Sequence, residues 1–206
     1  MTVTEAINAR RSVHSYDTSK SISDKELREL IELSTLAPSS FNLNHWRFIT
    51  VRSDDGKKRL HAASFDQKHI LDASAVLIVL GKIDAHEDVE KFTGDWVNKG
   101  YYADEKHLKI VTSKFYGLNP TVQRDEAIRS TSIMIGMMML AAKERGLDTS
   151  AIIGFKPDEV VEAFNIPSNY LPVMLLTVGH ELTPPPERVI RLNYDEIVYE
   201  ETFPVD

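Results

Sequence analysis

The 206-residue sequence predicts a single α+β domain. Two continuous apolar runs, at residues 74–81 and 172–179, each end in glycine and are typical of strands that are covered on both faces. The segments between these strands have helical periodicity, and the predicted helices outnumber the strands. Because the strands are too few for a doubly wound nucleotide-binding sheet, an α+β arrangement is favoured.

Sequence signals for helix starts and ends locate the remaining elements. Residues 2–5 and 23–26 both have the capping-box form, in which a hydroxyl and a carboxylate bond the free amides of a first helical turn. The second helix should end near Ala37, because Pro38 disfavours helical geometry in the residue before it. Further along the chain we expect a strand over 46–52, a polar helix over 53–63, a long helix over 120–145 closed by Gly146, and a short helix over 157–164.

Two segments are predicted to lie outside the central part of the domain. Residues 84–117 are polar with scattered aromatic side chains, which indicates one or two amphipathic helices that form a lid. After the second apolar strand, Pro184-Pro185-Pro186 makes a stiff, extended spacer. We therefore expect residues 183–206 to form a C-terminal arm that lies on another surface, such as a second subunit.

Composition excludes several classes of function. The chain carries 31 acidic and 24 basic residues without a basic block, so nucleic acid is not an expected partner. It has no cysteine, which excludes disulfides, thiolate nucleophiles, iron–sulfur clusters and cysteine-ligated zinc. The seven histidines lack ligand-like spacing, so we expect no metal site. No apolar run approaches the ~20 residues that span a bilayer, and a cytoplasmic protein without membrane contact is the default expectation.

Two clusters of hydrogen-bonding side chains stand out, at Arg10-Arg11-Ser12-Val13-His14 and between Pro38 and Trp46. Guanidinium groups match a phosphate in two-point geometry, while serine hydroxyls and an asparagine amide can bond the polar edge of a ring. The sequence lacks a Gly-x-Gly-x-x-Gly turn and a Gly-Lys-Ser/Thr loop, so a phosphorylated cofactor would bind in another way. The alternative is a plain scaffold, in which these arginines pair with the excess carboxylates.

Four motifs in the same order from residue 4 to about residue 198 carry a family resemblance: Arg10-Arg11-Ser12, Pro38-Ser39-Ser40-x-Asn42 before Trp46, Leu71-Asp72-Ala73-Ser74, and Ile153-Gly154-Phe155. The chain resembles the FMN-dependent nitroreductases. The resemblance implies a three-layer α+β fold with a mostly antiparallel central sheet. It also implies an obligate homodimer that holds FMN at the subunit interface and exchanges its C-terminal arms.

The resemblance also implies roles for individual residues. Arg10, Arg11, Ser12 and Arg191 would contact the phosphate and ribityl end of FMN, and the amides of Ile153 and Gly154 would donate to flavin N5. His14 stands where relatives often carry lysine or arginine near flavin N1 and O2, so its charge is conditional on pH. The remaining cofactor-binding candidates are Pro38, Ser39, Ser40 and Asn42 from the loop after the second helix, and Asp66, Gln67 and His69 from a segment that faces the flavin or the nicotinamide.

The activity implied by the resemblance is a two-step exchange. NAD(P)H gives a hydride to flavin N5 and leaves, and a nitroaromatic or quinone-type acceptor then takes its place. No side chain is required as a catalytic acid or base, because the cofactor carries the electron chemistry. The alternative within the same fold is an FMN-binding module, a sensor or carrier, without turnover.

Overall fold

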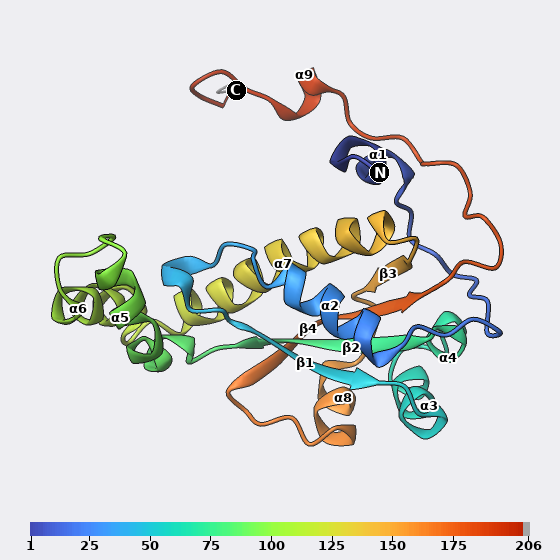
Figure 1. Ribbon diagram of the computed structural model, residues 1–206, viewed down its shortest axis with the longest axis horizontal. Coiled ribbons are helices and arrows are strands. Elements are labelled where there is room, and N and C mark those ends of the chain that lie inside the picture. The colour runs from blue at the N-terminus through green and yellow to red at the C-terminus, as the bar shows by residue number, and fades with distance from the viewer. Residues whose placement is uncertain (204–206) are drawn as a thin grey trace.

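The computed structural model describes residues 1–203 and has a four-stranded sheet at its centre (Figure 1). The strands are β1 (Trp46–Val51), β2 (Ala75–Lys82), β3 (Asp148–Ile152) and β4 (Tyr170–Gly179). Their order is β1-β2-β4-β3, and all three neighbouring pairs are antiparallel. The expected mainly antiparallel sheet is thus confirmed.

The predicted helices begin and end within about three residues of the expected positions, and both predicted capping boxes are formed. The structure adds short elements that the sequence reading did not identify: α4, α9 and two 3-10 turns at Ser40–Asn42 and Ala85–Asp88. The helices are α1 (Val3–Ala9), α2 (Asp24–Ser34), α3 (Asp54–Ala62), α4 (His69–Asp72), α5 (Glu90–Asn98), α6 (Glu105–Tyr116), α7 (Pro120–Glu144), α8 (Pro157–Ala163) and α9 (Tyr194–Ile197).

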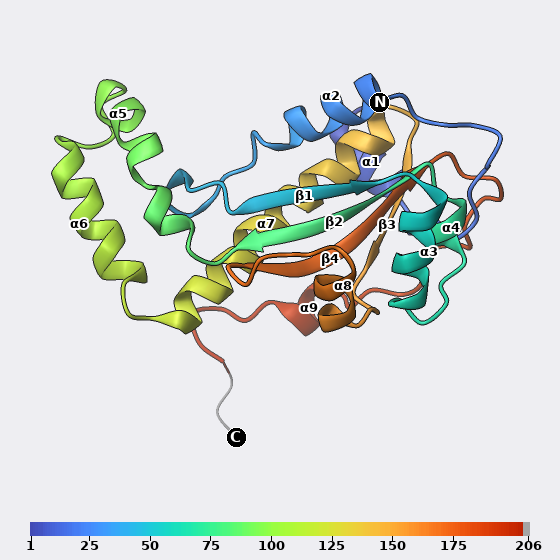
Figure 2. The same cartoon turned by 90° about the horizontal axis from the view of Figure 1, so that it is seen from below.

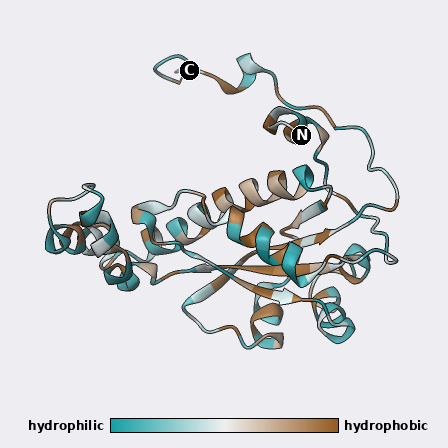
Figure 3. Cartoon of the chain, viewed as in Figure 1, coloured by the Kyte–Doolittle hydropathy of each residue, from teal (hydrophilic) through white to brown (hydrophobic). Residues whose placement is uncertain are grey.

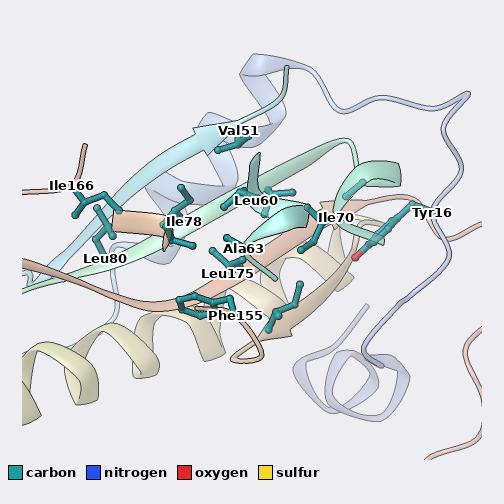
Figure 4. Close-up of a cluster of buried hydrophobic side chains, with 14 of the residues drawn as sticks. Tyr16, Val51, Leu60, Ala63, Ile70, Ile78, Leu80, Phe155, Ile166 and Leu175 are labelled. Atoms are coloured by element: carbon teal, nitrogen blue, oxygen red, sulfur yellow. The ribbon is translucent and has the colours of Figure 1, made fainter. Parts of the chain in front are cut away.

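Helices cover both faces of the sheet and create three layers (Figure 2). Strand β2 is buried along its whole length, and its side chains alternate between the two cores. Ile78 and its alternate neighbours pack with residues of α3, α4 and α8, as Figure 4 shows. Leu77 and its alternate neighbours pack with residues of α2 and α7. This arrangement explains why β2 reads as a continuous apolar run.

Strand β3 was not predicted. Its sequence, Asp148-Thr149-Ser150-Ala151-Ile152, has short polar side chains and lies at an edge of the sheet, where it pairs with β4 alone. Such a strand lacks the apolar signature on which a sequence reading depends. The main chain of Ser12 forms an isolated parallel bridge with Thr149, and the Val13 amide donates to the Thr149 carbonyl at 3.2 Å. Strand β3 therefore positions the arginine-rich segment of the N-terminus.

Two parts of the chain extend from the three layers. Helices α5 and α6 project at one end of the long axis (Figures 1 and 2), and Leu108 and Tyr116 of α6 pack in a small separate core. The arm after β4 runs past α1, and α9 lies within it (Figure 1). Residues 204–206 of the predicted arm lie outside the described residues. No helix among residues 1–203 has the length and apolar character needed to cross a membrane.

Candidate functional site

Arginines from both ends of the chain gather beside the C-terminal end of α1. The Arg188 guanidinium donates to the carbonyl oxygens of Ile7 at 2.9 Å and Arg10 at 3.0 Å, which caps α1 and fastens the arm to it. The pKa of Arg188 is lowered by burial first and then by the charges of Arg11, Arg10 and Arg191. The four guanidinium groups therefore share one positively charged region.

These four guanidinium groups form no salt bridge within residues 1–203. None of Arg10, Arg11, Arg188 and Arg191 lies within 4.0 Å of a carboxylate of residues 1–203, although the chain has an acidic excess. The arginine–carboxylate pairs that do form involve other arginines, such as Arg28 with Glu32 on the surface of α2. The plain-scaffold alternative requires the predicted arginines to be paired in this way, and no such pair forms among residues 1–203. Uncompensated guanidinium groups of this kind suit an anionic ligand.

A second group of predicted residues lies next to the end of β3. Gln67 donates through its side-chain amide to the Gly154 carbonyl at 2.6 Å and to the Ser64 carbonyl at 3.0 Å. Ile153 and Gly154 are exposed at this turn, and the Gly154 amide has no acceptor among the described residues. The turn thus presents a free backbone donor to whatever binds there.

The backbone before Gln67 is in an uncommon conformation. Phe65 and Asp66 have φ values of 51° and 55°, in the left-handed region, which aspartate tolerates and phenylalanine rarely adopts. The Asp66 carboxylate lies 3.4 Å from Nδ1 of His61. Strained backbone of this kind is retained where the surrounding structure requires it, and it is concentrated at functional sites.

Two histidines of the predicted site form a stacked pair. The ring centroids of His14 and His69 are 4.6 Å apart, and the ring planes differ by 14°. His14 is exposed, whereas His69 at the start of α4 is buried and its Nε2 has no hydrogen-bond partner among residues 1–203. Burial, followed by the neighbouring His14, lowers the pKa of His69, and Asp72 opposes that shift.

The loop before β1 is also strained and is held in shape by its own polar groups. Phe41, Asn42 and Asn44 have φ values of 48°, 51° and 50°. The Ser39 hydroxyl accepts a 3.0 Å hydrogen bond from the Asn44 amide, and the Asn44 side chain donates to the Asn42 carbonyl at 2.5 Å. Asparagine tolerates the left-handed region, which is one reason for its use here. The backbone amide of Ser40 donates a hydrogen bond to the hydroxyl of Ser130 on α7.

A buried aromatic cluster stands behind this loop, and the sequence reading missed it. Tyr116 of α6 is fully buried, its hydroxyl lies 3.4 Å from Nε2 of His45, and its ring stacks on that of His86. Burial raises the pKa of Tyr116, and the neighbouring Ser40 hydroxyl opposes the rise. Burial also lowers the pKa of His45 to about 4. These contacts join the loop to the projecting helices.

The predicted cofactor-binding residues therefore form two groups, which lie apart from each other within a single chain. The segments at 10–14, 66–69, 153–154 and 188–191 are linked through β3, α1 and α4. The loop with Pro38, Ser39, Ser40 and Asn42 instead contacts α7 and lies at the end of the molecule that carries α5 and α6 (Figure 1). Arg188 belongs to the first group but was not predicted. No cluster of three histidine or acidic side chains within residues 1–203 could hold a metal ion.

Comparisons with known proteins agree with this architecture. The model of the family described as "Nitroreductase family" matches residues 7–180. The curated protein "Putative NAD(P)H nitroreductase YodC" of Bacillus subtilis is 37% identical over 182 residues, which cover 87% of this chain and 90% of that protein. "Putative NAD(P)H nitroreductase MhqN" of the same organism is 38% identical over 186 residues, covering 87% and 89%.

Solved structures show the same similarity. The crystal structure of a "putative nitroreductase in complex with FMN" from Exiguobacterium sibiricum has a TM-score of 0.88 and 30% identity, and covers 97% of both chains. The crystal structure of the "putative nitroreductase ydfN" from Bacillus subtilis has a TM-score of 0.90 and 34% identity, covering 95% of this chain and 97% of that one. The fold, the family match and these identities together establish that this chain belongs to the nitroreductase family.

Proposed function

We propose that this protein is an FMN-dependent oxidoreductase that passes a hydride from NAD(P)H to nitroaromatic or quinone-type acceptors. The observation that carries the proposal is the region of four guanidinium groups, which has no carboxylate partner among the described residues. Planar guanidinium groups bind phosphate by paired hydrogen bonds, and FMN ends in a phosphate. The FMN present in the Exiguobacterium sibiricum relative supports this choice of ligand.

In this proposal the residues around β3 hold one copy of the cofactor. Arg10, Arg11 and Arg191 bind the phosphate end with Ser12, and the free amide at Gly154 donates to the polar edge of the ring. His14, His69, Asp66 and Gln67 line the other edge. When bound, FMN supplies the hydride chemistry, and these residues orient the ring and exclude water from one of its faces.

The proposal includes a homodimer, because the second group of residues must come from another copy. The loop between α2 and β1, which contains residues 38–42, lies toward the end of the molecule that carries α5 and α6, away from α1 (Figure 1). A shallow apolar groove of about 330 Å³ runs between α1, α2 and α7, and is lined by Val3, Leu36 and Met137 among others. Such a groove needs an apolar partner, and the arm offers one.

The arm has the composition that this groove requires. Ile190 is 95% exposed and Leu192 is 63% exposed, and neither belongs to a hydrophobic core of this chain. Figure 3 shows apolar stretches in both α1 and the arm. We propose that the arm, described over residues 183–203, reaches the groove of the partner subunit, and that residues 84–117 form a lid over the partner's flavin. The exposed Phe115, which lies 5.6 Å from Phe41 between ring centroids, would give this lid a flat apolar surface for aromatic acceptors.

The test compares FMN with riboflavin, which lacks the phosphate. Wild-type protein should bind FMN far more tightly than riboflavin, and Arg10→Ala with Arg191→Ala should weaken FMN binding by about 100-fold or more while riboflavin binding stays unchanged. Arg28→Ala is the matched control, because Arg28 is an exposed arginine paired with Glu32 on α2. Binding is measured by quenching of flavin fluorescence.

Turnover is measured on the same preparations. Steady oxidation of NADH or NADPH with a quinone or nitroarene supports the enzyme, whereas FMN binding without catalytic consumption supports the sensor or carrier alternative. Failure to take up FMN at all would overturn the cofactor assignment. A loss of FMN and riboflavin binding to the same extent in the double variant would overturn the role of the arginines.

A further inference from the structure

Tyr16 is buried where the N-terminal segment crosses the ends of β3 and β4. It is only 2% exposed and packs at one end of the core shown in Figure 4. Ser12 forms a parallel bridge with Thr149 of β3, whereas Tyr16 forms an antiparallel bridge with Glu181 at the start of the arm. The segment from Ser12 to Tyr16 therefore runs from β3 to the beginning of the arm.

The Tyr16 hydroxyl begins a directed chain of hydrogen bonds across the two strands. It lies 2.8 Å from the Thr177 hydroxyl of β4, which in turn donates to the Ser150 carbonyl of β3 at 3.3 Å. Because the carbonyl can only accept, the single hydroxyl proton of Thr177 is used there, and Tyr16 is the donor to Thr177. Burial raises the pKa of Tyr16, which keeps this donor protonated.

The ring of Tyr16 lies where only a glycine leaves room for it. A Cβ on Gly179, the last residue of β4, would stand 2.9 Å from Cδ1 of Tyr16, which is closer than side-chain contacts allow. The adjacent main chain is held as well, since the Asp17 amide donates to the His180 carbonyl at 2.8 Å. The ring, the hydroxyl and the neighbouring main chain of Tyr16 are therefore all fixed in position.

Three segments of the proposed flavin site start near this residue. The N-terminal segment carries Arg10, β3 leads to the turn at Gly154, and the arm after β4 carries Arg191. Tyr16 belongs to the first segment, reaches the second through Thr177 and pairs with the beginning of the third. Its position therefore connects the groups proposed for the phosphate end of FMN to the amide proposed for the ring.

We propose that Tyr16 is a positioning residue that sets the span between the positively charged region beside α1 and the turn at Gly154, so that one FMN molecule binds both at once. The inference rests on the proposed function, which divides the cofactor between these two places. Binding at one end of a ligand favours binding at the other end only when the two places are correctly spaced. The affinity gained from the phosphate therefore depends on Tyr16, although its buried side chain is not itself a ligand.

The test compares how tightly FMN and riboflavin bind, because only FMN can use both places. In Tyr16→Phe the ring still fills its space, but the chain of hydrogen bonds loses its first donor. We expect FMN affinity to fall by about tenfold, while riboflavin affinity changes by less than about threefold. Tyr170→Phe is the matched control, since Tyr170 packs against the same core at the opposite end of β4. It should bind both flavins as wild type does.

Thr177 offers a second pair of variants that break or keep the same chain. Thr177→Val removes the hydroxyl that accepts from Tyr16, and it should lower the preference for FMN over riboflavin as Tyr16→Phe does. Thr177→Ser retains a hydroxyl and should keep the wild-type preference. Because both substitutions interrupt one chain, Tyr16→Phe combined with Thr177→Val should lose no more preference than either single variant. This pair also carries the test if Tyr16→Phe folds poorly.

The outcomes separate positioning from stability alone and from the proposed function. A Tyr16→Phe variant with a lower unfolding midpoint but an unchanged preference for FMN would overturn the positioning role and leave the proposed function standing. An equal loss of both affinities would also overturn it, because spacing matters only to the ligand that has two bound ends. A wild-type protein that takes up no FMN would overturn the proposed function together with this inference.

Discussion

The side-chain amide of Gln67 donates a 2.6 Å hydrogen bond to the carbonyl oxygen of Gly154, which lies 87 residues further along the chain. The same amide donates to the Ser64 carbonyl, so both of its hydrogens are used by main-chain acceptors. This pair of hydrogen bonds sets the position of the exposed turn at Ile153 relative to the left-handed backbone at Asp66. Two segments of the proposed flavin site are thereby held as one unit.

Gln67→Glu should disrupt this unit, because a carboxylate can only accept and would face two carbonyl oxygens. We expect a loss of about 1–3 kcal/mol of stability together with weaker FMN binding, measured by chemical denaturation and by flavin titration. Arg59→Ala is the control, since Arg59 of α3 donates a hydrogen bond to the Ala163 carbonyl at the end of α8, outside the segments of the proposed flavin site. The control should lose stability and keep its FMN affinity. Equal losses of affinity in both variants would contradict the assignment.

Arg188 should matter for FMN binding although no motif marked it. Arg188→Ala removes the hydrogen bonds that fasten the arm to the end of α1, and it also removes one of the four positive charges. We expect FMN affinity to fall by about tenfold or more with little change for riboflavin. Calorimetric titration with both ligands measures this. A variant with unchanged FMN affinity would show that the arm is positioned without Arg188.

Two glycines predict opposite effects of the same substitution. A Cβ on Gly81 of β2 would stand 2.9 Å from the Ala127 carbonyl oxygen of α7, so Gly81→Ala must push the helix from the sheet. Gly136 in the interior of α7 has open space at the same position. We expect Gly81→Ala to cost about 1–3 kcal/mol and Gly136→Ala to gain about 0.5–1 kcal/mol in urea denaturation. The groove of the proposed dimer is adjacent to α7, so these measurements belong at a fixed protein concentration.

His45 should make the folded state sensitive to acid. Its folded-state pKa of about 4 lies below the ordinary value of 6.5, so the unfolded chain binds more protons between these two values. Stability should therefore fall as pH drops from about 6.5 to about 4, by roughly 3 kcal/mol from this group. His45→Gln should remove that part of the decline while keeping a donor toward Tyr116. If wild type and His45→Gln lose stability in parallel over this range, the buried histidine is not responsible.

The apolar groove and the arm should be needed for dimer formation. Leu36→Glu in the groove and Ile190→Glu in the arm each place a charge where we propose that two copies meet. We expect either change to shift the protein from dimer to monomer and to weaken FMN binding, as measured by light scattering and flavin titration. Leu118→Glu, which alters a fully exposed leucine after α6, should leave the dimer's molecular mass in solution unchanged. A wild-type monomer would contradict the proposed division of the site between two copies.

Local patterns in the sequence predicted the features that depend on neighbouring residues. Hydroxyl and carboxylate three residues apart produced the caps of α1 and α2, and apolar runs indicated the buried strands β2 and β4. Four ordered motifs, at residues 10–12, 38–42, 71–74 and 153–155, carried the resemblance to the family. The caps and the buried strands follow from chemistry within a few residues, so no knowledge of the fold was needed to predict them.

Only the packed structure decided which distant groups meet. Arg188 contacts Arg10 across 178 positions, and His14 stacks on His69 because α4 and the N-terminal segment both lie against the same side of the fold. Strand β3 is defined by its pairing with β4, since its own short polar side chains carry no apolar pattern. The separation of the Ser39 loop from the arginine region is likewise a result of how the layers pack. Contacts of this kind depend on burial and geometry summed over the whole chain, which no local pattern encodes.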